Sequence, residues 1–356
     1  MRHPNLEQEL QRRGARLESC AVTRVKDFGD AAREAQAAFD HGAVHDQSFA
    51  ARLAVRGRDR VDFVNRLCTN DVTRTSDRTA LTAAMTNAKG RVLDHVSIYQ
   101  RSDAVVLSGS ESQGTSLKQW LEKFIVMEDC VVNDLAAEEF RLLVFGRSVP
   151  DVLVSVLGLW PATAGDGSWP VARSRFQDGD VFVVCVPAPF GNGALLQGPH
   201  EISGRLFATL ADAGLRPVGS EAFEQVRVES GLPALPREIG DHSNPLEAGL
   251  RRSVSFQKGC YIGQEVVARL ENYHKVRRAL SCLAFPIEAE PSELGEVFVE
   301  LLRIGEISSA VRSPRLNATV ALAFLNPQYA APGTRVYSIV RGEQIHGDVR
   351  EFPVVR

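Results

Sequence analysis

The sequence predicts an α+β fold: a mainly antiparallel sheet with helices, followed by a small C-terminal barrel or sandwich of antiparallel strands. Two observations indicate this class. Up to about residue 275, segments with the two-residue alternation of strands lie between segments with helical spacing. Beyond residue 275, short apolar runs follow one another with frequent turns, which is typical of a small all-β domain.

The first 140 residues are expected to form helical pieces, a hairpin and further strands. Residues 1–45 contain leucines at roughly helical spacing. The expected strands are residues 49–55, 80–85, 92–99 and 105–108, and the expected helices are residues 59–67 and 117–124. The Asn-Ala-Lys-Gly turn at residues 87–90 joins the second and third of these strands.

The second part of the chain is expected to continue with two apolar strands, residues 141–145 and 181–186, and a helix at residues 150–157 between them. A helix at residues 201–213 should end at Gly214, and a helix at residues 221–230 should start at Ser220 as N-cap and stop at Gly231. The C-terminal strands are expected at residues 279–285, 296–299, 304–309, 319–325, 335–339 and 343–349.

Length, charge and cysteine content set broad limits. At about 150 residues per domain, a chain of 356 residues suggests two or three domains. The net charge of −3 gives no indication of a nucleic-acid or membrane partner, and no apolar run or N-terminal apolar segment predicts a membrane span or a secretory signal. The six cysteines are scattered without a Cys-x-x-Cys pair, so we expect reduced thiols, no metal site and a cytoplasmic protein.

One strand carries two ionisable groups on opposite faces. In residues 92–99 the alternation places Asp94 with Val92 and Val96, and His95 with Ser97. If either face is buried, its ionisable group needs a partner or a ligand. A single histidine without a second ligand nearby is more typical of a hydrogen-bonded sheet residue than of a metal ligand.

Two further places concentrate polar chemistry. Residues 258–265 read Lys-Gly-Cys-Tyr-Ile-Gly-Gln-Glu and hold a cation, a thiol, a phenol, an amide and a carboxylate in a segment with two glycines, which predicts a loop rather than a core element. Glu229 lies in the last turn of its expected helix, where the helix dipole disfavours an anion. It is either a solvated carboxylate or one that accepts paired N–H donors, such as those of a pterin or guanine edge. Arg227 is expected to pair with Glu224.

Several segments resemble a known family. Residues 258–265 match the signature Lys-Gly-Cys-Tyr-x-Gly-Gln-Glu of the YgfZ-type folate-binding proteins, which include bacterial proteins and mitochondrial relatives in iron–sulfur assembly. Segments at residues 67–72, 227–231, 244–248 and 313–316 agree in order and are shared with the aminomethyltransferase (T-protein) of the glycine cleavage system. The resemblance covers nearly the whole chain.

The resemblance implies a three-part molecule with antiparallel sheets around a central channel that binds tetrahydrofolate or a derivative. It implies a folate-binding region at residues 1–275, with subdomains at about residues 46–140 and at residues 1–45 plus 141–275, and a small β-barrel at residues 276–356. The implied function is a tetrahydrofolate-binding accessory protein that supports assembly or repair of iron–sulfur clusters, notably in [4Fe–4S] enzymes that include tRNA-modifying ones. Its partners would be folate and iron–sulfur client or assembly proteins.

The alternative is a tetrahydrofolate-dependent aminomethyltransferase or demethylase. The transferases carry Gly-Gly-x-x-Asp-Asp on the strand that holds Asp94 here, and the second aspartate, which is assigned to catalysis, is His95 in this chain. A tyrosine of those enzymes is replaced by Thr82. An imidazole does not replace a carboxylate that stabilises positive charge on a folate nitrogen, which weakens this alternative.

The expected site follows from the loop, Glu229 and the resemblance together. Cys260 is the expected reactive group, as a nucleophile, a redox-active thiol or a transient cluster ligand, and Lys258 would lower the pKa of its thiol. The residues expected to contact the folate are Glu229, Lys258, Tyr261, Gln264 and Asp94, with Glu229 on the N–H edge of the pterin. We expect Glu229 and Cys260 to share one pocket.

Overall fold

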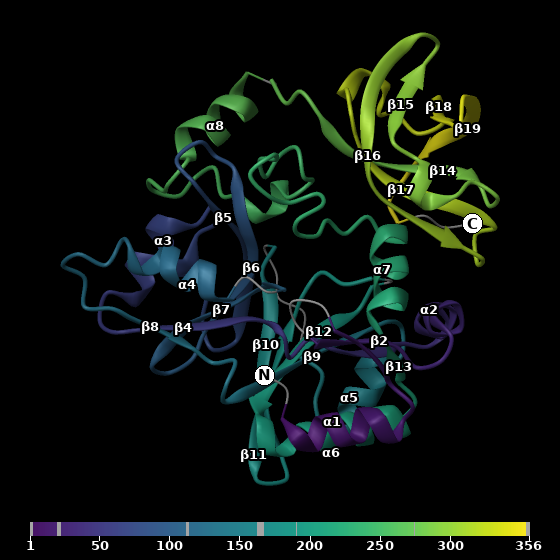
Figure 1. The fold of residues 1–356 in the computed structure, drawn as a ribbon. Coiled ribbons are helices and arrows are strands. Elements are labelled where there is room, and N and C mark those ends of the chain that lie inside the picture. Colours follow the sequence, from purple (N-terminus) through teal and green to yellow (C-terminus); the bar gives the residue numbers. More distant parts are fainter. Residues whose placement is uncertain are drawn as a thin grey trace.

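The computed structural model describes residues 3–19, 23–111, 114–161, 167–189, 191–273 and 275–353 (Figure 1). Within these residues the strands form a two-stranded sheet, an eleven-stranded sheet and a closed six-stranded barrel. The predicted α+β class and the C-terminal barrel are confirmed. No helix in the described part of the chain is long and apolar enough to cross a membrane.

The helices and strands have the following bounds. The helices are α1 (Pro4–Arg12), α2 (Ala31–Asp40), α3 (Arg60–Leu67), α4 (Gly114–Glu122), α5 (Val149–Leu157), α6 (Ser203–Asp212), α7 (Ser220–Glu229) and α8 (Gln264–Asn272). The sheet strands are β1 (Arg16–Ser19), β2 (Thr23–Asp27), β3 (Ala43–Asp46), β4 (Ala50–Arg56), β5 (Thr79–Thr86), β6 (Val92–Gln100), β7 (Ala104–Glu111), β8 (Val131–Asp134), β9 (Glu139–Phe145), β10 (Trp169–Phe176), β11 (Gly179–Cys185), β12 (Gly193–Pro199) and β13 (Arg216–Val218). The barrel strands are β14 (Ala279–Pro286), β15 (Glu296–Val299), β16 (Leu302–Ser313), β17 (Ala318–Leu325), β18 (Arg335–Val340) and β19 (Glu343–Arg350).

The large sheet has two halves joined by a short pairing. Its strand order is β13-β3-β9-β12-β11-β10-β5-β6-β7-β4-β8, and all pairs are antiparallel except β13 with β3. Strands β5 and β10 meet only at Ala80 with Trp169 and Thr79 with Pro170. We call β4–β8 with α3 and α4 the head, and β3 with β9–β13 the base. The predicted subdomain boundaries stay a prediction.

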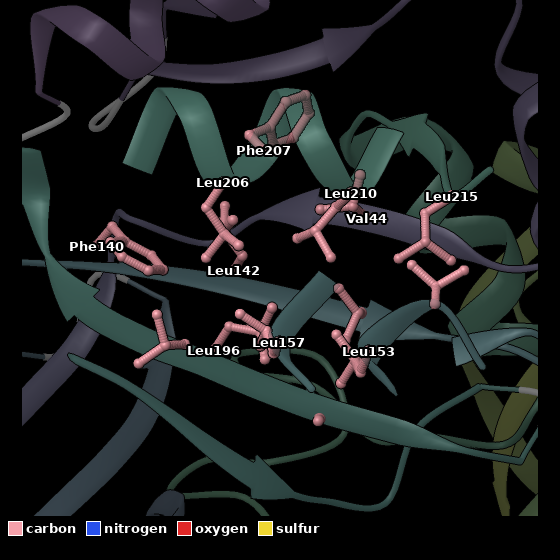
Figure 2. Close-up of a cluster of buried hydrophobic side chains, with 14 of the residues drawn as sticks. Val44, Phe140, Leu142, Leu153, Leu157, Leu196, Leu206, Phe207, Leu210 and Leu215 are labelled. Carbon is pink, nitrogen blue, oxygen red and sulfur yellow. The ribbon is translucent and has the colours of Figure 1, made fainter. Parts of the chain in front are cut away.

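Strand β9 of the base is buried on both faces, which explains its long apolar run. Alternate residues of β9, Phe140, Leu142 and Val144, pack with α1, α5 and α6 (Figure 2). The intervening Leu143 and Phe145 point to the other face and pack with α2 and α7. A strand with two buried faces carries apolar residues at successive positions, so residues 142–145 show no alternation.

Helix α7 lies between the base and the barrel (Figure 1). On one side Ala222 and Val226 pack with the base sheet. On the other side Val228 packs with Cys282 and Val320 of the barrel. The C-terminal half of α7 is therefore buried all round, and its charged residues are buried with it.

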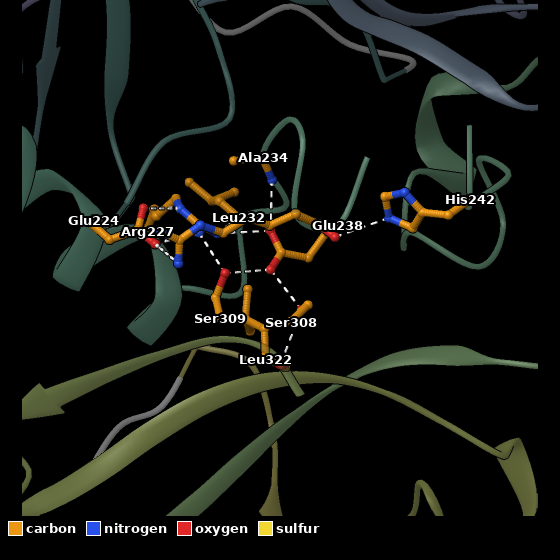
Figure 3. A network of polar contacts seen from close by, with 10 residues as sticks. Glu224, Arg227, Leu232, Ala234, Glu238, His242, Ser308, Ser309 and Leu322 are labelled. Atoms are coloured by element: carbon orange, nitrogen blue, oxygen red, sulfur yellow. Dashed lines mark hydrogen bonds and ion pairs between the residues drawn. The ribbon is translucent and has the colours of Figure 1, made fainter. Parts of the chain in front are cut away.

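A charged network fixes α7 to the barrel (Figure 3). The guanidinium of Arg227 pairs with Glu224 at 2.6 Å, which confirms the predicted pair, and with Glu238 at 3.0 Å. It also donates to Ser309 Oγ of β16 at 2.8 Å. Glu238 is fully buried and accepts from the hydroxyls of Ser308 and Ser309 at 2.7 and 2.6 Å. All the charges in this network have partners, as buried charges require.

Several elements differ from the sequence-based expectation. Residues 1–45 contain β1, β2 and β3 besides helices, and β8, β10, β12, β13 and α8 were not predicted. Strand β10 carries Arg173 and Arg175 at alternate positions, and β12 contains two glycines and ends at a proline, so neither has a strong strand pattern. Helix α6 is followed by Gly214 at φ +111° and α7 by Gly231 at φ +74°, as expected for both stops.

The predicted N-cap of α7 is wrong. Ser220 is the first residue of the helix and Gly219 is its N-cap, with no side-chain cap of its own. The Gly219 N–H donates instead to the carboxylate of Glu34, a buried residue of α2, at 2.9 Å. A carboxylate from another element thus takes the place of a local hydroxyl at the positive end of the helix dipole.

Removing the Glu238 carboxylate should loosen the barrel. Because Glu238→Ala leaves the Arg227 guanidinium buried without one of its two carboxylates, we expect the free energy of unfolding in urea to fall by about 3–5 kcal/mol. Glu296→Ala, which removes an exposed partner of Arg303, should change it by less than about 1 kcal/mol. Equal effects of the two substitutions would contradict the network's role.

Candidate functional site

The β5–β6 hairpin places Asp94 and His95 on opposite faces of the head, as predicted. Asp94 lies opposite Met85 and His95 lies opposite Ala84. The expected grouping of Val92 with Asp94 is wrong, because a bulge at this end of the hairpin shifts the register by one residue. Val92 therefore packs with Ala84 on the face of His95. This face, which we call the inner face, is covered by residues 231–253.

Asp94 is held on the opposite, outer face. Its side chain is 1% exposed, and its two oxygens accept the Ser110 N–H at 3.1 Å, while Oδ1 also accepts the His95 N–H at 2.8 Å. A Cβ at Gly109 would lie 2.4 Å from Oδ2, so a larger residue at that position of the neighbouring strand would displace the Asp94 carboxylate. Burial raises the pKa of Asp94 to about 6, even though these hydrogen bonds favour the carboxylate.

His95 belongs to a neutral polar cluster on the inner face. Its Nε2 lies 2.9 Å from Ser253 Oγ, which lies 2.8 Å from Thr82 Oγ1. The Ser253 carbonyl accepts the hydroxyl of Thr69 at 2.6 Å, which fixes the backbone of the loop over the strand. Ser253 and Thr82 are buried, and His95 is half-buried. Burial lowers the pKa of His95 to about 4, so the imidazole is neutral at physiological pH. We call Thr82, Ser253 and His95 the inner-face cluster.

The loop that carries Cys260 is anchored through Lys258. The ammonium of Lys258 donates to the carbonyls of Asn65, Cys68 and Asn70 at 2.5, 2.9 and 2.8 Å, which uses all three of its N–H donors. These carbonyls lie at and beyond the C-terminus of α3, where a cation is favoured by the helix dipole. The Lys258 ammonium is thus directed to the head, and its expected effect on the Cys260 thiol stays a prediction. Burial lowers the pKa of Lys258 itself.

The other end of the loop is fixed on the hairpin. The Ile262 N–H donates to the Arg66 carbonyl at 3.2 Å, and the Ile262 carbonyl accepts the Thr86 hydroxyl at 2.6 Å. Gly263 has φ +84° and approaches the turn so closely that a Cβ would lie 2.5 Å from the Asn87 carbonyl. Only glycine fits this position. The loop is therefore rigidly held on both sides.

Between these anchors the loop residues differ in exposure. Tyr261 is buried, with the Lys258 ammonium 5.3 Å from the centre of its ring, and burial raises the pKa of Tyr261 to about 12. Gln264 is half-exposed and begins α8. Cys260 is exposed and forms no disulfide. The other four described cysteines also form no disulfide, but they are buried, and Cys20 lies outside the described residues. The structure thus presents the Cys260 thiol outward on a fixed frame.

Glu229 is also held firmly, by different elements. It is 1% exposed, its Oε1 accepts Gln225 Nε2 at 3.0 Å, and its Oε2 accepts Arg315 at 2.6 Å. Arg315 belongs to the turn between β16 and β17 of the barrel and lies 4.1 Å above the ring of Phe39. This cation offsets the unfavourable position of the carboxylate in the last turn of α7. The solvated alternative for Glu229 is therefore wrong.

The predicted site residues fall into two groups. Ser253 begins the loop that carries Lys258, Cys260 and Tyr261, so the inner-face cluster and the thiol are supplied by one segment on the head. Glu229 is anchored instead on α7 and the barrel. A pocket shared by Glu229 and Cys260 stays a prediction. In the described ranges, no three His, Cys, Asp or Glu side chains form a group that could hold a metal ion.

Sequence reasoning missed two of the residues that complete these groups. Ser253 has no pattern in the sequence that singles it out, although it is the hydrogen-bond partner of His95. Arg315 lies within the 313–316 segment that resembles the T-protein, but nothing in the sequence pairs it with Glu229. The face shared by Thr82 and His95 follows from the antiparallel pairing of the hairpin, so that part was accessible from the sequence.

Comparison with known proteins agrees with this architecture. Residues 6–164 match the family described as the GCVT N-terminal domain, and residues 278–355 match the glycine cleavage T-protein C-terminal barrel domain. An aminomethyltransferase of Chlorobium luteolum is 28% identical over 94% of this chain and 96% of that protein. A putative chloroplastic transferase of Arabidopsis thaliana is 28% identical over 96% of this chain and 77% of that protein.

A solved structure shows the same fold throughout. The glycine cleavage system aminomethyltransferase T of Bartonella henselae superposes with a TM-score of 0.85 at 21% identity, covering 99% of this chain and 97% of that one. With both family matches in the same order, the chain belongs to the superfamily of glycine cleavage T-proteins.

The raised pKa of Asp94 predicts a pH-dependent stability. Because the folded protein holds this proton up to about pH 6 and the unfolded chain only to about pH 4, stability should fall as the pH rises between these values, by up to about 3 kcal/mol. The measurement is urea unfolding of the wild type and Asp94→Asn at pH 4 and pH 7. The wild type should lose more stability than the variant across this range, and parallel curves would show that Asp94 titrates normally.

Proposed function

We propose that this protein binds a tetrahydrofolate and acts in tetrahydrofolate-dependent one-carbon transfer. The observation that carries the proposal is the match to both T-protein domains, together with aminomethyltransferase relatives that align over nearly the whole chain. The inner-face cluster supports it, because it supplies a half-buried imidazole backed by two hydroxyls at the position that the resemblance assigns to catalysis.

The form of the transfer differs from glycine cleavage. The transferases that this chain resembles carry a carboxylate where this chain has His95, and the His95 imidazole is neutral. A neutral imidazole does not stabilise a developing cation as a carboxylate does, but it forms hydrogen bonds to a ligand without placing a charge in the buried cluster. This favours a one-carbon reaction other than aminomethyl transfer, such as demethylation.

Glu229 is the proposed anchor of the pterin ring. Its carboxylate is buried and fixed in orientation, which is the arrangement needed to accept two parallel N–H bonds from a ring edge. Arg315 would have to share or yield its place on Oε2 when the ring binds. Asp94, Lys258, Tyr261 and Gln264 remain proposed folate contacts of the head.

Glu229→Ala should weaken tetrahydrofolate binding more than tenfold in isothermal titration calorimetry, because two charge-assisted hydrogen bonds are lost. Glu265→Ala, an exposed carboxylate at the start of α8, should leave the affinity unchanged. Glu229→Ala also removes the ion pair with Arg315. Folding is therefore controlled by a melting curve and by a second variant, Glu229→Gln, which keeps the shape of the side chain. Unchanged affinity in both folded Glu229 variants would refute the assignment.

A second candidate is the YgfZ-type role, a folate-binding accessory protein for iron–sulfur clusters. The specific observation in its favour is the exposed Cys260 on a fixed loop within the family signature. One thiol cannot hold a cluster alone, so this role needs a client or assembly protein that supplies further ligands. The clients would be [4Fe–4S] enzymes, tRNA-modifying ones among them.

The two candidates are separated by pairing an assay with a genetic test. In a deletion strain, Cys260→Ser should fail to restore [4Fe–4S] enzyme activities if the thiol serves the accessory role, whereas Ser255→Ala in the same loop should restore them. Full rescue by Cys260→Ser would remove the thiol from that role. Measurable methylene transfer by the purified protein with a lipoylated carrier protein would instead establish the glycine-cleavage form.

A further inference from the structure

The three side chains of the inner-face cluster form a row of hydrogen bonds with Ser253 in the middle. Ser253 Oγ lies between Thr82 Oγ1 and His95 Nε2, at 2.8 and 2.9 Å, so it donates to one and accepts from the other. Thr82 and Ser253 are 7% and 3% exposed, whereas His95 is half-buried. Of the three residues, His95 is therefore the least buried, and its remaining nitrogen, Nδ1, takes no part in the hydrogen bonds of the cluster.

The direction of these hydrogen bonds decides whether His95 Nδ1 is a donor or an acceptor. The buried Thr82 hydroxyl has Ser253 Oγ as its hydrogen-bond partner among the described residues, so its O–H is satisfied when it donates to Ser253. Ser253 then donates to His95 Nε2, and the proton of the neutral imidazole lies on Nδ1. A hydroxyl rotates to suit its partners, so both hydroxyls can adopt this arrangement without a change of geometry. His95 then presents an N–H donor, backed by two hydroxyl dipoles that point toward it.

The cluster as described contains no charge that could balance a cation. The neighbouring carboxylate, Asp94, lies on the outer face, where its oxygens are occupied by Ser110 and by the His95 backbone N–H. A cationic ligand group placed against the imidazole would be buried without a counter-ion, which is costly. An oxygen that carries partial negative charge is the complementary group for an N–H donor.

We propose that His95, supported by Ser253 and Thr82, receives the carbonyl oxygen of a tetrahydrofolate that carries its one-carbon unit at the formyl level. This inference rests on the proposed folate-dependent function. Among folate one-carbon units, the methylene unit opens to a cationic iminium and the methyl unit has no hydrogen-bonding atom, whereas the formyl unit has an acceptor oxygen. The formyl unit therefore matches a neutral donor that has no carboxylate beside it.

The test compares three ligands on matched variants. Isothermal titration calorimetry with 5-formyltetrahydrofolate, 5-methyltetrahydrofolate and tetrahydrofolate should show that the wild type binds the formyl form at least tenfold more tightly than the methyl form. His95→Asp should abolish this preference, because it places an anion against the carbonyl oxygen. His95→Gln, which retains an N–H donor without charge, should keep most of it, and Ser97→Ala on the same face should keep all of it.

Ser253→Ala provides a second route that leaves the His95 side chain in place. It should reduce the formyl preference severalfold, since the imidazole loses the partner that fixes its tautomer, while the affinity for the methyl form stays unchanged. Equal affinities for the three folates in the wild type, or a preference that survives His95→Asp, would overturn the inference and leave folate binding intact. Absence of binding for all three would instead reject the proposed function.

Discussion

The burial of two charges at the end of α7 is the constraint on which the rest of the structure depends. Arg227 and Glu229 lie between the base sheet and the barrel, and burying an ion costs several kcal/mol unless it is paired. Each finds a partner outside its own helix: Glu238 and Ser309 for Arg227, and Arg315 for Glu229. A barrel docked in another position would take Arg315 away from Glu229 and the Ser309 hydroxyl away from Arg227. The polar contacts thus specify the position of the barrel, whereas Val228 stabilises the same interface through apolar contacts with Cys282 and Val320.

The same constraint reaches the site through one continuous segment. The chain leaves α7, contributes Glu238 to the ionic network, and then covers the inner face of the head, where Ile239, Ala248 and Leu250 pack against Ala84 and Val92 of the hairpin. The Ser243 carbonyl accepts the Val92 N–H at 3.1 Å, so the segment continues the hydrogen bonding of the strand edge. It then delivers Ser253 to His95 and continues into the loop of Cys260. Docking of the barrel and assembly of the inner-face cluster are therefore coupled by the chain itself.

What could be predicted from the sequence is what depends on local pattern. The hairpin with its opposite-facing Asp94 and His95, the stop of α7 at Gly231 and the Arg227–Glu224 pair follow from periodicity, turn chemistry and helical spacing. Tertiary contacts decided the rest. Lys258 finds the end of α3, nearly two hundred residues earlier in the chain, and Glu34 replaces the expected cap of α7. The bulge that turns Val92 inward has no marker in its sequence, since both faces of the hairpin carry apolar residues at that end.

The adjacent residues Asp94 and His95 show how one strand separates two electrostatic environments. The outer face stabilises its carboxyl group with backbone N–H donors, yet burial still favours the protonated form, so this face carries its charge only at a cost. The inner face avoids charge and relies on dipoles, because an imidazole and two hydroxyls satisfy one another without ions. Dipoles that are already oriented need no reorganisation when a ligand arrives, and they act strongly where water is excluded. The chemistry of the inner face should therefore depend on hydrogen-bond direction, whereas the exposed thiol of Cys260 takes no part in the inner-face cluster.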